Sequence, residues 1–492
     1  MSREQVTETS VSLNEQEKIP LEYDEIEVEA GNVDDIEKNH DVFAKKDGGP
    51  DFRGLSWLGA AALIAKTQIG LGVLGIPQTF QAMGFVPGLI CLIILCTLTT
   101  WTGVIVGQFR LRHPNVHSIG DASYILFGRV GLELMGCVSW LFYTLCYGAG
   151  LLTVSIAFNT LTGHPVCTMA WVGMGAAVAM VIGLSIRTMK VLSWCGYVAV
   201  VSVLAGIWIV AIACLAQSTP AAAPEGEPID KMIQAVSSSP YSTIATAIGT
   251  QVMSLAGTAS FFTIHSEMAE QTKFNRALFL GQGLTVLNYI VIACIVYGKV
   301  GQYVASPALG SAGPLIKKIA YGISLPALFF ACFWQAHIAG KYALVRILRG
   351  TKHLQSNSFV HWATWISMML LVIVVGLIVA SSIPFFDDLL GLTGSLLGTS
   401  FTLIIPGFMA LYMLAEDGGA TELSKRPLRW LGQSGKMWFS NKKSFIITVA
   451  GWICIIGGAY ITVSGVYGSV ESIIGEYAAG TVGSAFSCED NS

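Results

Sequence analysis

The sequence contains few charged residues. Only 12% of its 492 residues are Asp, Glu, Lys or Arg, whereas soluble globular proteins carry about 25%. Hydrophobic residues make up 53% of the chain, and the mean hydropathy is +0.62. A water-soluble fold of this size would lack the polar residues to cover its surface. The net charge of −3 also provides no basic surface for nucleic acid. We therefore expect a polytopic membrane protein with no nucleic-acid partner.

Motifs of membrane enzymes and ATP-driven pumps are also missing. The sequence has no His-Glu-x-x-His zinc motif and no Gly-x4-Gly-Lys-Ser/Thr loop for nucleotide phosphates. It also has no Gly-x-Ser-x-Gly nucleophile elbow. We accordingly expect no enzymatic activity, no cofactor and no metal site.

The 11 cysteines do not follow a disulfide or metal-binding pattern. Nine lie inside apolar blocks, where we interpret them as small apolar residues: Cys91, Cys96, Cys137, Cys146, Cys195, Cys214, Cys294, Cys332 and Cys454. Cys167 and Cys488 lie in polar connecting segments, and the sequence leaves open whether they pair.

Residues 1–50 differ in composition from the rest of the chain. They contain fourteen Asp or Glu, five Lys or Arg and no sustained apolar run. Such a segment buries too little apolar surface to offset the entropy of ordering it. We predict a disordered acidic cytosolic tail at 1–50, a transmembrane transporter domain at 51–468 and a short extracytoplasmic tail at 469–492.

Eleven apolar blocks follow the tail. A bilayer core about 30 Å thick needs roughly 20 apolar residues per helix. The predicted spans are 57–82, 86–108, 131–160, 168–186, 190–216, 244–269, 276–299, 315–346, 361–382, 388–414 and 445–468. The sequence therefore predicts an all-α membrane protein with eleven transmembrane helices.

The basic residues predict its orientation. If the N-terminus is cytosolic, 23 of the 28 Lys and Arg residues fall on the inner side and four on the outer side, with Lys66 inside helix 1. Cytoplasmic loops are enriched in Lys and Arg. We therefore expect a cytosolic N-terminus and an extracytoplasmic C-terminus.

Helices 1 and 6 contain sequence that weakens a helix at mid-span. Three glycines and Pro77 fall within residues 70–77, and residues 254–260 read Ser-Leu-Ala-Gly-Thr-Ala-Ser. If helices 1–5 and 6–10 are inverted repeats, these segments occupy corresponding positions, which is the sequence pattern of a transporter binding site. The alternative is that these glycines only allow close helix packing.

Two such breaks suit a zwitterionic ligand. The half-helix starting near Gly70–Gly72 offers free N–H groups to a carboxylate, and carbonyls near Thr67 and residues 254–257 can accept from an ammonium group. Aromatic residues of helices 3 and 6 are candidates to wall the site. The candidate substrate-binding residues are Thr67, Gly70, Leu71, Gly72, Tyr143, Tyr147, Ser254, Gly257, Thr258 and Phe261.

Three segments resemble the amino acid/auxin permease family, and among its members most of all the fungal neutral and aromatic amino acid permeases. They are the helix 1 stretch 70–77 with Met83-Gly84, the stretch 118–124 with Phe127-Gly128, and the stretch 394–400 ending at Pro406. The resemblance covers about residues 50–415. It implies a LeuT-type fold of five plus five inverted helices with an eleventh helix, and amino acid transport driven by protons or sodium.

Lys66 and His337 are the candidate ion-coupling residues. Each lies nine residues from a predicted membrane edge, or about 14 Å along a helix. The LeuT-type fold implies that helices 1 and 8 line an inner cation site, where an ammonium group would exclude sodium. We therefore expect the two residues to share one proton. The alternative is that Lys66 reaches inner water and His337 bonds a carbonyl.

The sequence thus predicts a proton-coupled symporter of neutral amino acids that works by alternating access. Its partners are the amino acid, protons and the lipid bilayer. The alternatives are transport of another small amine or a nucleobase, or an amino acid sensor of the same fold that does not transport. We expect the plasma membrane as its location, with the vacuolar membrane as the alternative.

Overall fold

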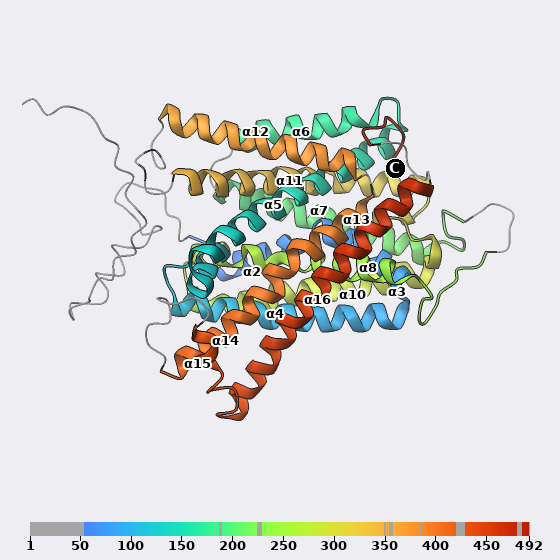
Figure 1. Cartoon of the computed structure of the whole chain (residues 1–492). Helices are drawn as coiled ribbons and strands as arrows, with labels where there is room; N and C mark the ends of the chain where they lie inside the picture. The colour runs from blue at the N-terminus through green and yellow to red at the C-terminus, as the bar shows by residue number, and fades with distance from the viewer. Residues whose placement is uncertain are drawn as a thin grey trace, which may run out of the picture.

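Helices form nearly all the secondary structure of this computed structural model (Figure 1). It describes residues 54–185, 189–223, 229–348, 351, 353, 358–383, 385–419, 429–479 and 485–491. Within them, the β-structure is one isolated bridge between Leu55 and Met268. The predicted all-α class is confirmed, whereas the acidic tail predicted at 1–50 lies outside the described residues.

The first half of the bundle begins with a broken helix. Its elements are α2 (Trp57–Gln68), α3 (Leu71–Met83), α4 (Phe85–Arg112), α5 (Ile119–Thr162), α6 (Thr168–Ser185) and α7 (Met189–Ala216). The pair α2 and α3 is bent by 48°. The predicted break of helix 1 is therefore confirmed, and it lies between Gln68 and Leu71.

The second half also begins with a broken helix, in which α8 (Tyr241–Ser254) is joined to α9 (Phe261–Glu267) through the 3-10 turn η1 (Ala256–Ser260). The elements that follow are η2 (Gln271–Lys273), α10 (Phe274–Val300), η3 (Gly301–Tyr303), η4 (Ala308–Ser311), α11 (Pro314–Leu348), α12 (Phe359–Ser382), α13 (Phe386–Thr393), the π-helical turns η5 (Gly394–Gly398) and η6 (Ser400–Ile404), α14 (Ile405–Asp417), α15 (Arg429–Ser434) and α16 (Lys442–Ala479). Ten helical segments of the described chain are long and apolar enough to cross a membrane, and the bent pair α2–α3 makes eleven. This agrees with the predicted number of spans.

Two helices are longer than predicted. The segment expected as a loop before helix 3 is the first part of α5, where Ser118 and Asp121 form a capping box and Gly128 (φ 68°) kinks the helix. A left-handed φ of this kind is readily adopted by glycine. The last helix, α16, continues to Ala479, beyond the end of the predicted span at 468.

The helices sort into two groups. The helices α5, α6, α11 and α12 pack on one another, and three of them, α6, α11 and α12, lie along the upper edge of the bundle in Figure 1. The broken helices pack with α4, α10, α13 and α16. The segment where α2 meets α3 lies against η1 and α11, so the two breaks are close to the scaffold formed by the first group.

The end of the chain is bound to one end each of α5, α6 and α12. A disulfide joins Cys167 to Cys488, which settles the pairing that the sequence left open. The backbone N–H of Phe486 donates to the carbonyl of Ser381 at 3.0 Å. The Asn491 amide donates to Ser155 at 2.9 Å. These contacts place residues 486–491 on the same side of the bundle as the α5–α6 connection.

Candidate functional site

The break of the first helix exposes unpaired backbone groups. Helix α2 ends at Gln68, and α3 begins at Leu71 with Gly70 as its N-cap residue, which provides no side-chain hydrogen bond. The first N–H groups of any helix lack partners within that helix. At α3 they lie inside the protein, because Leu71 and Gly72 are buried. An anion is therefore favoured at this point.

The two breaks pack directly against each other. The Ser254 hydroxyl donates to the carbonyl of Gly72 at 3.1 Å. A Cβ atom built on Gly72 would lie 2.7 Å from the Ser254 Cα. A Cβ on Gly257 would lie 2.7 Å from the Thr67 hydroxyl oxygen. Both glycines are thus needed for the close approach of the breaks, which supports the packing explanation of these glycines as well as the binding-site explanation.

A cavity lies beside the breaks. It is lined by residues of α2, α3, α5, α7, α8, η1 and α11. Seven of the twelve sequence-predicted site residues line it, namely Lys66, Thr67, Gly70, Leu71, Gly72, Tyr143 and Gly257. The structure also places there residues that the sequence argument did not select, among them Phe142, Ser260, Phe330, Trp334 and Gln335.

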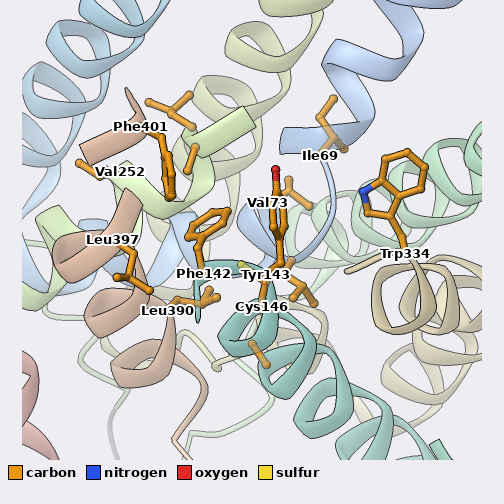
Figure 2. Close-up of a cluster of buried hydrophobic side chains, with 14 of the residues drawn as sticks. Ile69, Val73, Phe142, Tyr143, Cys146, Val252, Trp334, Leu390, Leu397 and Phe401 are labelled. Atoms are coloured by element: carbon orange, nitrogen blue, oxygen red, sulfur yellow. The ribbon is translucent and has the colours of Figure 1, made fainter. Parts of the chain in front are cut away.

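The aromatic walls come from α5 and α11. Figure 2 shows Phe142 and Tyr143 side by side, with Trp334 on the far side of Tyr143 and the Tyr143 hydroxyl directed towards the segment of Ile69 and Val73. Phe142 packs edge to face on Phe401, with 5.1 Å between the ring centroids. These aromatic walls therefore combine the Tyr143 hydroxyl with apolar ring surfaces.

Lys66 is the charged residue among those lining the cavity. Its ammonium lies 3.5 Å from the ring centroid of Phe330 and 4.1 Å from that of Trp334, both on α11. An ammonium over an aromatic face is stabilised by the ring quadrupole. No ion pair to Lys66 is present among the described residues. Lys66 thus connects the broken helix to α11 without a carboxylate.

The other five predicted residues lie away from the cavity. Tyr147 packs against α12, where a Cβ on Gly376 would meet its ring, and Phe261 packs on Phe274 with 6.2 Å between centroids. Ser254 and Thr258 are both buried, and Ser254 lies in the contact between the breaks. His337 packs edge to face on Trp365 of α12 at 5.4 Å. Among the described contacts, none joins Lys66 to His337.

Tyr289 of α10 is the main residue that the sequence argument missed. Its hydroxyl lies 2.7 Å from the carbonyl oxygen of Gln68 and 2.8 Å from that of Ser254. Gln68 also donates from its side-chain amide to Gln282 at 2.8 Å. The sequence contains only a weak indication of this contact. A tyrosine and two glutamines inside apolar blocks show that polar side chains lie within the membrane-spanning helices, but not which helix break they contact.

Comparisons with known proteins agree with this architecture. A family model described as transmembrane amino acid transporter protein matches residues 53–464. A transmembrane transporter of Gibberella moniliformis is 30% identical over 493 residues, covering 100% of this chain and 98% of the relative. The N amino acid transport system protein of Neurospora crassa is 26% identical, covering 90% of each chain.

Solved structures share the fold at low sequence identity. MhsT in complex with L-phenylalanine has a TM-score of 0.50 and 12% identity, covering 83% of this chain and 98% of that chain. Inward-facing Mhp1 has a TM-score of 0.51 and 13% identity, covering 87% and 92%. These likenesses confirm the LeuT-type fold. The family match over residues 53–464 and the relative that is 30% identical over its length show that the chain belongs to the transmembrane amino acid transporter family.

Proposed function

We propose that this amino acid transporter is a symporter of neutral amino acids and protons. The observation that carries the proposal is the cavity at the two breaks, where the unpaired N–H groups of α3 face largely apolar and aromatic walls. Those N–H groups bind the substrate carboxylate, as helix N-termini bind anions. The backbone carbonyls of η1 accept hydrogen bonds from the substrate ammonium group.

The lining of the cavity supports a neutral side chain. No carboxylate side chain lines it, so a lysine or arginine substrate would find no counter-charge there. The positive charge of Lys66 at the wall also repels a cationic side chain. Phe142, Phe330 and Trp334 instead offer apolar surface, to which an aliphatic or aromatic side chain binds by the hydrophobic effect.

Proton coupling rests on the position of Lys66. Its ammonium stands between the broken helix and α11, over two aromatic faces and with no described ion pair. A positive charge at this position disfavours entry of sodium by direct repulsion. We propose that Lys66 gains a proton from one side of the membrane and loses it to the other as the cavity alternates. His337, one turn after Trp334 on α11, remains a second candidate, although its ring packs on Trp365 of α12.

The distribution of charge and the disulfide support a cytosolic N-terminus. Basic residues concentrate on one side, which is the cytosolic side in membrane proteins generally. The Cys167–Cys488 bond lies on the opposite side, and disulfides persist in oxidising extracytoplasmic environments. We place the protein in the plasma membrane, with the vacuolar membrane as the alternative that localisation of the tagged protein would test.

Uptake into proteoliposomes tests the function. We expect purified protein to accumulate labelled leucine when the exterior is acidic and the interior alkaline, in sodium-free buffer, and to stop when a protonophore is added. Unlabelled leucine or phenylalanine should compete better than lysine or glutamate. An absolute requirement for sodium would refute proton coupling. Binding of leucine without uptake under any gradient would identify a sensor instead of a transporter.

A further inference from the structure

A single tyrosine of α10 contacts both broken helices at equivalent positions. Gln68 is the last residue of α2, and Ser254 is the last residue of α8. The Tyr289 hydroxyl lies 2.7 Å from the first carbonyl oxygen and 2.8 Å from the second. The C-terminal ends of the two half-helices therefore meet at one phenol.

This position demands a hydrogen-bond donor. The last carbonyls of a helix lack partners within that helix, and two helix C-termini bring partial negative charge to the same point. Gln68, Ser254 and Tyr289 are all buried, with at most 3% of each residue exposed, so bulk solvent has little access to these carbonyls. The carbonyl of Gln68 also accepts from the Gly70 N–H at 2.8 Å, whereas the Ser254 carbonyl depends more on the phenol.

The phenol also sets how closely the breaks approach. A hydroxyl has one proton, so Tyr289 serves both carbonyls only while they stay within reach of one oxygen atom. A Cβ on Gly72 would lie 2.8 Å from that same oxygen. The start of α3, the end of α2 and the end of α8 are thus all in contact with the Tyr289 hydroxyl.

Helix α10 holds the end of α2 at a second point. Gln282 accepts from the Gln68 side-chain amide at 2.8 Å and donates to Thr99 of α4 at 3.2 Å. Gln282 and Tyr289 are seven residues apart and therefore lie on one face of α10. The Gln282 contact fixes the side chain of Gln68, and the Tyr289 contact fixes its backbone.

We propose that Tyr289 is a positioning residue for the substrate site. It does not line the cavity. It holds the ends of α2 and α8 at the separation at which the N–H groups of α3 and the carbonyls of η1 bind one substrate backbone. The inference rests on the proposed binding site at the breaks, and it predicts an effect on substrate affinity that is the same for substrates with different side chains.

The variant Tyr289→Phe tests this role, because it removes one oxygen and keeps the buried ring. Tyr297→Phe is the matched control, since Tyr297 is a buried tyrosine two turns later in α10 whose hydroxyl accepts from the Gln234 N–H in the α7–α8 connection. The measurements are equilibrium binding of labelled leucine and labelled alanine to purified protein, the melting temperature, and the kinetics of uptake into proteoliposomes.

We expect Tyr289→Phe to raise the Kd of both amino acids by about tenfold, the size typical of one buried hydrogen bond left unmade. The KM should rise by the same factor, with a kcat within about twofold of wild type. Tyr297→Phe should leave the Kd unchanged. An unchanged Kd in Tyr289→Phe, or a loss confined to melting temperature and yield, would overturn the inference. If the wild type binds leucine without transporting it, the proposed function fails, and the Kd ratio still decides the role of Tyr289.

Discussion

Replacing Gly72 with alanine should weaken substrate binding by about tenfold or more. The added Cβ would lie 2.7 Å from the Ser254 Cα, 2.8 Å from the Tyr289 hydroxyl and 2.9 Å from the Ser254 Cβ. Ordinary contacts of a Cβ begin at 3.4 Å, so the breaks must move apart. Because the nearest atom belongs to the backbone, a change of side-chain rotamer does not relieve the clash.

The size of the effect follows from overpacking. An extra methyl group in a well-packed interior costs about 1–3 kcal/mol. If the breaks separate instead, the same free energy is lost from substrate binding, which corresponds to a Kd about tenfold higher or more. We expect Gly72→Ala to reach the membrane in normal amounts and to take up substrate about tenfold more slowly than the wild type at substrate concentrations well below the wild-type KM. Gly257→Val should behave in the same way, because its side chain would meet Thr67 and Gln68.

A binding and uptake assay in proteoliposomes checks this prediction. Gly283→Ala is the control, because Gly283 lies on the exposed face of α10 and its Cβ would meet nothing within 4 Å. In the double variant Gly72→Ala with Ser254→Gly, binding should stay impaired, since the clash with the Ser254 Cα remains. Wild-type affinity in Gly72→Ala would refute the proposed site, and rescue by Ser254→Gly would show that a side chain limits the approach of the breaks.

Three further predictions concern coupling, stability and orientation. Lys66→Met should retain leucine exchange but lose accumulation driven by a proton gradient, whereas Lys299→Met, in the last turn of α10, should keep that accumulation. Unchanged pH dependence in Lys66→Met would rule out Lys66 as the proton carrier. Cys488→Ser should lower the free energy of unfolding by about 2–4 kcal/mol, measured as a lower melting temperature with an unchanged KM. The control Cys137→Ser removes an exposed free thiol and should melt like the wild type. An epitope at the C-terminus should be accessible on intact cells and one at the N-terminus only after permeabilisation; the reverse pattern would contradict the assigned orientation.

Local sequence determined the spans and the breaks. Eleven apolar blocks predict eleven spans because each span must satisfy the bilayer independently of its neighbours. The breaks are likewise local, since glycine and proline weaken the hydrogen-bond ladder of the helix that contains them. For this reason the predicted interruption near Gly70 and that at 254–260 are found where the sequence places them.

Which residues meet at the breaks was decided by the tertiary structure. Tyr143 and Tyr147 lie one turn apart on α5, yet the first lines the cavity and the second packs on α12. Their environment depends on where α11 and α12 pass, which the sequence of α5 does not contain. The Lys66 ammonium lies against α11, whereas the His337 ring of that helix packs on Trp365.

The longest-range contacts were the least predictable. Tyr289 is separated from Gln68 by 221 residues, and Cys167 from Cys488 by 321. A buried tyrosine in an apolar block has the same sequence pattern whether its hydroxyl meets a helix end or a neighbouring loop. The contact of the Tyr289 hydroxyl with two helix ends is decided by the packing of α10, which brings that hydroxyl within 2.7 Å of the Gln68 carbonyl and 2.8 Å of the Ser254 carbonyl.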